Sequence, residues 1–432
     1  MPRKKRFTKP STARRAKSSA PARRAQMPSS GRVTRIATVT WAVCLSVLVA
    51  AAAIAERRPA VGLIVLAVCA GAAWLVIRTG RPGACAAVLC GIVGLTAGIA
   101  FGPGHIVWAG VTWQAVAGLL LLAAGVVLLL TGIPRLLPGR TRGQFIARMA
   151  LALAAAVTVW TLTPAVVATN PPHIPSGDEK PEGFGLTARE VELLTSDGIK
   201  LGAWYVPSTN GAAVILRHGA GSTGSDVLAH AAALVHHGYG VLVTDARGHG
   251  MSGGRGMEFG WYGDLDIAAA VTFLLGQPDV DSDRIAVLGL SMGGEEAIGA
   301  AASEPRIAAV VAEGATARTA ADKAWFADVY AWRGRAQLVL ERIQYGVADL
   351  LTPASPPATL AASARDASPK PLLLITADEI ADEGHAAEYI REHSPDNVTV
   401  WTVPGAGHTE GLTVAPVLWE ETVVDFLDAA LA

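Results

Sequence analysis

One serine lies where a nucleophile could be built. In Gly289-Leu290-Ser291-Met292-Gly293 it follows an apolar run, Arg284–Leu288, and precedes a helix-like stretch, Gly294–Ser303. A strand–turn–helix of this kind places the serine oxygen at the C-terminal edge of a sheet, and the glycines let the chain turn without Cβ clashes. A serine held there can attack a carbonyl carbon, provided that a neighbouring base accepts its proton.

The same glycine–serine pattern occurs a second time, at Gly250-Met251-Ser252-Gly253-Gly254. This copy lies in a glycine-rich loop with no helix behind it. We therefore predict that Ser252 is not the nucleophile.

His408 is the histidine best placed to act as the base. It ends the loop Pro404–His408, which follows the last predicted strand and should open at the same edge of the sheet as Ser291. The order serine, acid, histidine along the chain fits this arrangement. Three other histidines, His230, His236 and His237, lie on one helical stretch and are predicted to be surface or packing residues. His393 lies near a helix end, and His249 and His385 lie in loops.

The acid that orients His408 is predicted to be Asp378, which comes directly after the apolar run Leu372–Thr376. Position rather than residue type decides this role, so neighbouring carboxylates stay open as alternatives. These are Glu379, Asp382 and Glu383 in the same loop, and Glu313 at the end of the preceding strand.

Two backbone N–H groups must face the negative charge that develops on the attacked carbonyl oxygen. We expect one from Met292, at the start of the helix after Ser291. The second is expected from Ala220, in the loop His218–Gly221 that follows a short apolar run. A plain glycine turn is the alternative for this loop.

The residues between these motifs alternate between short β-rich runs and helical stretches. A hairpin signal at Thr195–Gly198 comes first, and the alternation that follows argues for a mostly parallel α/β sheet. The predicted strands are Val191–Leu194, Ala203–Val206, Ala213–Leu216, Gly240–Thr244, Arg284–Leu288, Ala308–Ala312, Leu372–Thr376 and Val398–Val403, and helices are predicted at Ser225–His237 and Asp264–Leu275.

Four motifs in this order, His218–Gly221, Asp245–Ser252, Gly289–Gly294 and Pro404–His408, resemble the α/β-hydrolase superfamily. Within it they look like the monoacylglycerol lipase and serine aminopeptidase-like group. The resemblance implies a Ser–His–Asp triad, an acyl-enzyme intermediate, and no cofactor or metal. By position it assigns Ser291 as nucleophile, Asp378 as acid, His408 as base, and Ala220 with Met292 as the oxyanion pair.

Glu295 and Glu296 continue the helix after Ser291, where the family usually has small or apolar residues. Together with Glu313 they could hold a substrate ammonium group. We favour the alternative, a structural role near the start of the helix. A small helical lid is expected at about residues 315–366, where aromatic residues such as Trp325 and Trp332 could line an acyl pocket or simply pack.

The N-terminal part of the chain has a very different composition. Residues 1–177 contain 20 Lys or Arg and one acidic residue, Glu56, whereas residues 178–432 contain 16 basic and 35 acidic residues. Five apolar runs in the first part approach the ~20 residues that a helix needs to cross a bilayer. They are Val33–Ala55, Ala60–Ile77, Ala84–Phe101, Val111–Ile133 and Met149–Ala168.

The positions of Lys and Arg give these spans a direction. Residues 1–35 hold 12 basic residues, and the second and fourth connections are basic, whereas the third has none. This places the N-terminus in the cytoplasm and, after five spans, the C-terminal domain outside a bacterial-type plasma membrane. The basic tail is interpreted as an arm on the inner leaflet rather than a nucleic-acid binder. The spans contain no Asp, Glu or Lys, which argues against transport.

We therefore expect four parts: a basic tail at 1–32, an all-α transmembrane region at 33–168, a linker at 169–189 and an α/β-hydrolase domain at 190–432. The four cysteines all lie in the apolar part, so the C-terminal domain has no disulfide and no cysteine metal site. They are Cys44, Cys69, Cys85 and Cys90.

The leading interpretation is a membrane-anchored serine hydrolase that cleaves a small-molecule or lipid-like carboxylic ester. A peptidase or amidase is the alternative, because ester and amide hydrolysis use the same catalytic residues. A third reading, a non-catalytic binding or scaffold protein, is disfavoured by the intact nucleophile, base and oxyanion loop.

Overall fold

Long apolar helices come first in the residues that the structure, a computed structural model, describes: 80–432. Three stretches are long and apolar enough to cross a membrane, Arg81–Ala109, Trp113–Leu136 and Arg142–Thr169. They correspond to the last three of the five expected spans. The first two, Val33–Ala55 and Ala60–Ile77, lie outside the described residues. The helices are α3 (Arg81–Phe101), α4 (Pro103–Ala109), α5 (Trp113–Leu136) and α6 (Arg142–Thr169).

These helices pack through small residues. A Cβ on Gly98 of α3 would lie 2.4 Å from the backbone nitrogen of Leu122, and one on Gly118 of α5 would lie 2.2 Å from that of Gly102. Side chains at these positions would force the two helices apart. Small residues that let backbones approach in this way are typical of helix packing in a membrane.

The C-terminal part is built on a sheet of eight strands in the order β1-β2-β4-β3-β5-β6-β7-β8. β2 runs antiparallel to both of its neighbours, and every other neighbouring pair is parallel. The mostly parallel α/β sheet and its N-terminal hairpin are therefore confirmed. The strands are β1 (Arg189–Leu194), β2 (Lys200–Val206), β3 (Ala213–Arg217), β4 (Gly240–Thr244), β5 (Ile285–Leu290), β6 (Ala309–Glu313), β7 (Leu372–Ala377) and β8 (Val398–Val403).

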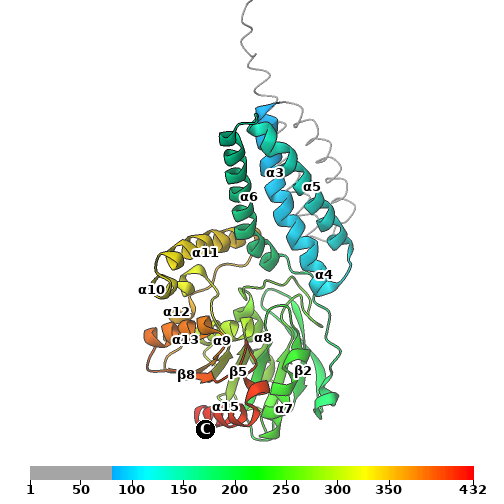
Figure 1. Cartoon of the computed structure of the whole chain (residues 1–432). Helices are drawn as coiled ribbons and strands as arrows, with labels where there is room; N and C mark the ends of the chain where they lie inside the picture. Colours follow the sequence, from blue (N-terminus) through cyan, green and yellow to red (C-terminus); the bar gives the residue numbers. More distant parts are fainter. Residues whose placement is uncertain (1–79) are drawn as a thin grey trace, which may run out of the picture.

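Helices cover both faces of this sheet (Figure 1). On one face, Ile215 and Val287 pack with residues of four helices. On the other face, the alternate strand residues Val214 and Leu288 pack with residues of two helices. The first four helices are α8 (Gly263–Leu274), α9 (Met292–Ser303), α12 (Leu360–Ala367) and α13 (Ala381–His393), and the other two are α7 (Leu228–His236) and α15 (Pro416–Ala430).

Two further helices, α10 (Phe326–Val329) and α11 (Ala331–Leu351), are inserted between β6 and β7. α11 contacts α6 and lies across the direction of the long helices, where these meet the α/β domain (Figure 1). The insertion was expected to cover the site as a lid. α11 lies at the junction between the two parts of the molecule, and none of its residues lines the cavity at Ser291, so the lid stays a prediction.

Candidate active site

Ser291 stands in a sharp turn between β5 and α9. Its backbone has φ 53° and ψ −120°, a conformation that non-glycine residues rarely adopt and that is typical of functional sites. The neighbouring glycines make the turn possible: a Cβ on Gly289 would lie 2.1 Å from the carbonyl oxygen of Gly293, and one on Gly293 would lie 2.5 Å from that of Arg217. The strand–turn–helix expected from the sequence therefore forms, with Ser291 at its apex.

His408 reaches Ser291 from the loop that follows β8. Its Nε2 lies 2.9 Å from the Ser291 hydroxyl oxygen, which is hydrogen-bond distance. The loop passes close to Gly314 after β6, where a Cβ would lie 2.9 Å from the His408 ring. Two residues that are 117 positions apart in the chain are thus brought into the geometry of a nucleophile and its base.

The carboxylate beside His408 belongs to Glu383, and the expectation of Asp378 is wrong. Glu383 Oε1 lies 2.5 Å from His408 Nδ1, and its other oxygen accepts a hydrogen bond from the Ala377 backbone at 2.9 Å. Asp378 is exposed, and its nearest polar partner is the backbone N–H of Gly405 at 3.4 Å.

The difference has a structural cause. Asp378 stands at the turn after β7, where its short side chain points to solvent. Glu383 lies in the first turn of α13, which folds back over that strand end. Its longer side chain is 1 % exposed and reaches the imidazole from there. The sequence offered Glu383 among the alternatives, but nothing in the spacing alone separated it from its neighbours.

The charge on Glu383 raises the pKa of His408 above its ordinary value, mainly through their hydrogen bond. The same contact fixes the tautomer: Nδ1 carries the proton and donates to Glu383, which leaves Nε2 free to accept the proton of Ser291.

The oxyanion residues expected from the sequence also lie at this place. Ala220 and Ser291 line the same cavity, of about 540 Å³, and a Cβ on Gly219 would lie 3.2 Å from that of Ser291. Met292 is the first residue of α9, and the backbone N–H groups of the first turn of a helix lack partners inside it. Within residues 80–432, neither Ala220 nor Met292 donates its backbone N–H to another group.

A buried histidine holds the loop His218–Gly221, the expected oxyanion loop, in place. Nε2 of His218 accepts a hydrogen bond from the Ala246 backbone at 2.9 Å, so its Nδ1 carries the proton and donates to the Gly219 carbonyl at 2.8 Å. Burial lowers the pKa of His218 well below its ordinary value, and the ring stays neutral. This role was not anticipated, although the His-Gly pair directly after a strand was its signal.

The cavity at Ser291 has a polar side. Ser222, Asp226, Thr409 and Thr413 line it, together with His230 of α7. His230 is 6 % exposed, burial lowers its pKa to about 4, and neither ring nitrogen has a hydrogen-bond partner in the described part of the chain. A neutral imidazole with free nitrogens is suited to contact a hydroxyl or carbonyl group of a substrate.

The three glutamates considered as an ammonium site are occupied by other groups. Glu295 accepts hydrogen bonds from the Thr316 backbone and hydroxyl and from the Ala317 backbone, and burial raises its pKa to about 7. Glu313 accepts from the Gly411 backbone and from the indole N–H of Trp419. Neither lines the cavity at Ser291.

Glu296 belongs to a buried network of charges beneath the site. Its Oε2 lies 2.5 Å from Nη2 of Arg217. The Asp266 carboxylate lies 3.7 Å from Nη2 of Arg217 and 2.7 Å from Nη2 of Arg247. Arg217 ends β3 and is fully buried, so the network ties the oxyanion strand to α9 and α8. The structural alternative, which we favoured for Glu295 and Glu296, agrees with these contacts. The sequence did not reveal the network itself.

The remaining candidate residues do not line the cavity at Ser291. Trp325 is buried against Phe326 and His385, and Trp332 of α11 is 75 % exposed; neither lines the cavity at Ser291. Ser252 is 1 % exposed and donates its hydroxyl to the Asp245 carbonyl at 2.7 Å. Residues 80–432 contain no cluster of three His, Cys, Asp or Glu able to hold a metal ion.

The helical bundle touches the oxyanion loop. A Cβ on Gly221 would lie 2.5 Å from the ring of Trp108, which belongs to α4. A second cavity, of about 190 Å³, lies here and is lined by Gly104 and Trp108 on one side and by Ala220 and Gly221 on the other. Ala220 therefore borders both this cavity and the one at Ser291.

Comparisons with known proteins agree with this arrangement for part of the chain. Residues 208–363 match the family model described as Serine aminopeptidase, S33. This segment contains Ser291 and the oxyanion loop and ends before Glu383 and His408. The match supports a hydrolase of the α/β-hydrolase superfamily.

Similar proteins are known from bacteria, archaea and fungi. An uncharacterized protein of Mycobacterium tuberculosis is 37% identical over 146 residues, which are 32% of this chain and 50% of the relative. A thiohydrolase of Aspergillus aculeatus is 37% identical over 129 residues, 29% of this chain and 41% of that protein. This chain therefore spans about half the length, or less, of these two relatives. The solved structure of a Pyrococcus furiosus esterase is 26% identical and covers 61% of this chain and 99% of its own, with a TM-score of 0.49.

Proposed function

We propose that the protein is a membrane-anchored serine hydrolase that cleaves carboxylic esters. The observation that carries the proposal is the continuous hydrogen-bonded series from Glu383 through His408 to Ser291, with contacts of 2.5 Å and 2.9 Å. A serine hydroxyl is a weak nucleophile until a base accepts its proton, and this series supplies the base and the group that orients it.

The reaction follows from these contacts. Ser291 Oγ attacks the ester carbonyl while His408 Nε2 accepts its proton, and the backbone N–H groups of Ala220 and Met292 stabilise the oxyanion. The C–O bond to the alcohol then breaks as His408 returns the proton to the leaving oxygen. Water then attacks the acyl-enzyme while His408 accepts its proton, and His408 returns that proton to Ser291 Oγ as the bond to the acyl group breaks and the acid leaves. The Glu383 carboxylate stabilises the His408 imidazolium in both halves of the reaction.

An ester is favoured over a peptide by the surroundings of the site. A peptidase that captures a free amine would need an ammonium site at Glu295, Glu296 and Glu313. All three carboxylates already bind groups of the protein itself. The polar residues of the cavity, including His230 and Thr409, suit an ester with hydroxyl or carbonyl groups near the scissile bond.

The membrane anchoring rests on the helical bundle. Its three long stretches reach mean hydropathies between 1.9 and 2.6 over their most apolar windows, and α5 and α6 expose large apolar side chains such as Leu130 and Trp160. The arginine-rich connections of the chain favour an N-terminus in the cytoplasm, so the hydrolase domain is proposed to work on the outer face.

A fluorophosphonate probe tests the proposal, because it reacts only with an activated serine. We expect the full-length protein in membranes to be labelled, Ser291→Ala to lose the label, and Ser282→Ala, an exposed serine far from His408 in the chain, to keep it. Labelling that persists in Ser291→Ala, or a folded wild-type protein that is never labelled, would contradict the proposal.

A further inference from the structure

α11 has two apolar faces. Its buried face carries Gly334, Leu338, Tyr345 and Ala348, together with Glu341, which pairs with Lys323. Leu338 packs with Trp325, Phe326 and Ala386, and Tyr345 and Ala348 pack with Ala165 of α6 and with Trp261. These contacts explain why the helix is attached to the protein. They do not explain the residues on its other side.

The opposite face carries a second apolar stripe that the described chain leaves uncovered. Trp332 is 75 % exposed, Val339 53 %, Ile343 46 % and Leu350 84 %. At 3.6 residues per turn, these positions fall on one line along the helix, roughly opposite the buried face. A helix that is apolar on two opposite faces needs two apolar partners.

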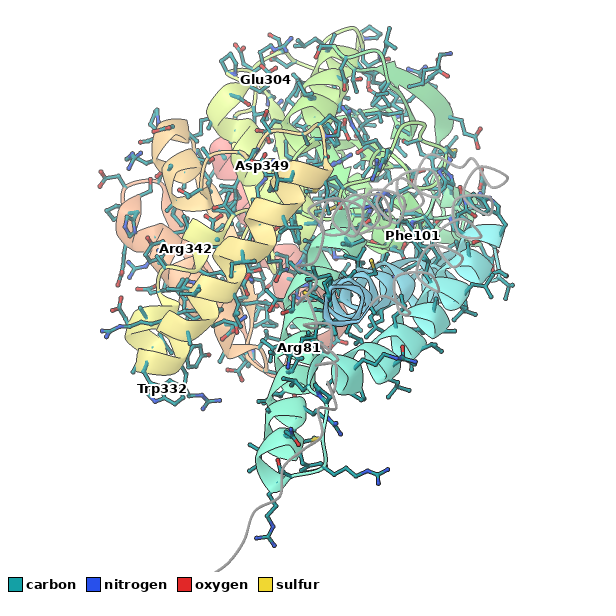
Figure 2. All side chains as sticks on the ribbon, turned by 90° about the horizontal axis from the view of Figure 1, so that it is seen from above. Arg81, Phe101, Glu304, Trp332, Arg342 and Asp349 are labelled. Atoms are coloured by element: carbon teal, nitrogen blue, oxygen red, sulfur yellow. The ribbon has the colours of Figure 1, made fainter. Side chains whose placement is uncertain are left out.

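The stripe is flanked by positive charge. Arg335 and Arg342 lie along one edge and Arg333 along the other, and none of the three forms an ion pair within residues 80–432. Seen along the long helices in Figure 2, α11 runs from Trp332 past Arg342 to Asp349 with no other described element drawn over it. An apolar stripe between arginines is the pattern of a helix that lies in the interface of a membrane.

The position of α11 also fits contact with a membrane surface. It crosses the direction of α3, α5 and α6 and touches α6 at Ala165, near the end of that helix (Figure 1). Five residues earlier on α6, or about 7.5 Å along its axis, Trp160 is 78 % exposed. Tryptophan is enriched at the boundary between lipid chains and headgroups. α11 therefore meets α6 close to the level where a bilayer around α6 would end.

We propose that the outer face of α11 binds the membrane surface, with Trp332, Val339, Ile343 and Leu350 among the acyl chains and the three arginines on anionic phospholipid headgroups. The hydrolase domain is then held against the bilayer at two places, α6 and α11. This inference rests on the proposed membrane anchoring and is independent of the catalytic residues.

The test measures the depth of α11 in vesicles. A cysteine introduced as Val339→Cys in a variant of the full chain that lacks its four native cysteines is labelled with bimane and reconstituted with phospholipids brominated on the acyl chains. We expect strong quenching by the brominated lipids and weak quenching by aqueous iodide. Ser282→Cys, on an exposed turn of the α/β domain, is the matched control and should show the reverse.

The dependence of this quenching on lipid charge is a second measurement. Quenching at position 339 should be stronger in vesicles that contain phosphatidylglycerol than in phosphatidylcholine alone. The double change Arg335→Glu and Arg342→Glu should reduce that difference by roughly half or more, because each basic residue near an anionic surface adds to the attraction. Arg365→Glu, which changes an exposed arginine of α12, should leave it unchanged.

Two outcomes would overturn the inference. Quenching of Val339→Cys by iodide but not by brominated lipid would mean that the stripe faces water. Protection from both quenchers would mean that a protein, either a second copy or another segment of this chain, covers it. Hydrolysis of a soluble ester is measured on the same vesicles, so a protein that is active but not quenched by lipid contradicts the role of α11 alone.

Discussion

The two parts of this molecule bury opposite kinds of residue. The helical bundle places glycines such as Gly98 and Gly118 at its contacts and turns Leu130, Leu153 and Trp160 outward, with exposed fractions of 70 %, 67 % and 78 %. The α/β domain does the reverse and fills both faces of its sheet with fully buried Val, Ile and Leu. The bundle thus exposes apolar side chains, as the proposed membrane anchoring requires, whereas the α/β domain buries them, as a domain folded in water does.

Charge follows the same division. The long apolar runs of the bundle contain no Asp, Glu or Lys, whereas the α/β domain buries Arg217, Glu296 and Asp266 together beneath its catalytic edge. A charge can be buried in a water-soluble domain when it is paired and hydrogen-bonded.

Breaking the buried charge network should cost the α/β domain the most. Arg217→Met leaves Glu296 and Asp266 without their shared partner, and removal of one member of a buried pair typically costs about 3–5 kcal/mol. We expect a loss of that size in the free energy of unfolding, measured by denaturant titration of the purified protein. Arg365→Met removes an exposed pair with Asp366 and should cost less than about 1 kcal/mol; equal losses would contradict the contrast.

Filling a glycine contact should destabilise the bundle. In Gly118→Ala, the new Cβ would lie 2.2 Å from the backbone nitrogen of Gly102, at the end of α3, and overpacking of this kind costs about 1–3 kcal/mol. Gly143→Ala is the matched control, because a Cβ at this helical position meets nothing within 4 Å. Unfolding in mixed micelles at rising fractions of dodecyl sulfate measures both; a destabilised Gly143→Ala beside an unchanged Gly118→Ala would refute the packing argument.

The contact between the two parts should affect catalysis more weakly. Trp108→Ala removes the ring that packs on Gly221, so the oxyanion loop loses support on its membrane side. Removal of a whole oxyanion donor costs 10²–10³-fold, and a loosened loop should cost less, about tenfold in kcat. Trp160→Ala, which changes an exposed tryptophan of α6, should leave kcat unchanged. A kcat for Trp108→Ala equal to the wild-type value would show that the bundle acts as an anchor only.

The pH dependence of the activity should shift in Glu383→Gln. His408 must be neutral to accept the serine proton, and Glu383 raises its pKa above the ordinary value, so activity should rise with pH through a midpoint above about 6.5. In Glu383→Gln the residual activity should rise at lower pH, because the negative charge that favours the imidazolium is gone. The measurement is kcat/KM of a soluble ester between pH 5 and pH 9. An unchanged midpoint would mean that Glu383 does not act on His408.

Much of this arrangement could be predicted from the sequence. Strand–turn–helix spacing located Ser291, and the loop after the last strand located His408, because both features are local in the chain. The predicted strands agree with the observed ones to within a few residues. The hairpin at the start of the sheet also followed from a short local pattern, Thr195–Gly198.

The acid and the buried network could not be predicted in this way. Which carboxylate reaches His408 depends on where α13 begins and how it folds over β7, and this is settled by tertiary packing. Arg217 and Glu296 are 79 residues apart, and no local pattern pairs them. The insertion after β6 carries a helical pattern, but only the folded structure shows that α11 packs against α6 of the bundle.

The proposed mechanism depends most directly on Glu383 as the partner of His408, and a comparison of two variants tests this. The kcat/KM of full-length Glu383→Gln and Asp378→Asn is measured beside the wild type on the same soluble ester. Neutralising the acid of a serine–histidine–acid triad lowers the rate by about 10⁴-fold, and we predict a loss of that order for Glu383→Gln and a change of less than about twofold for Asp378→Asn. A large loss in Asp378→Asn with a nearly unchanged Glu383→Gln would contradict the account.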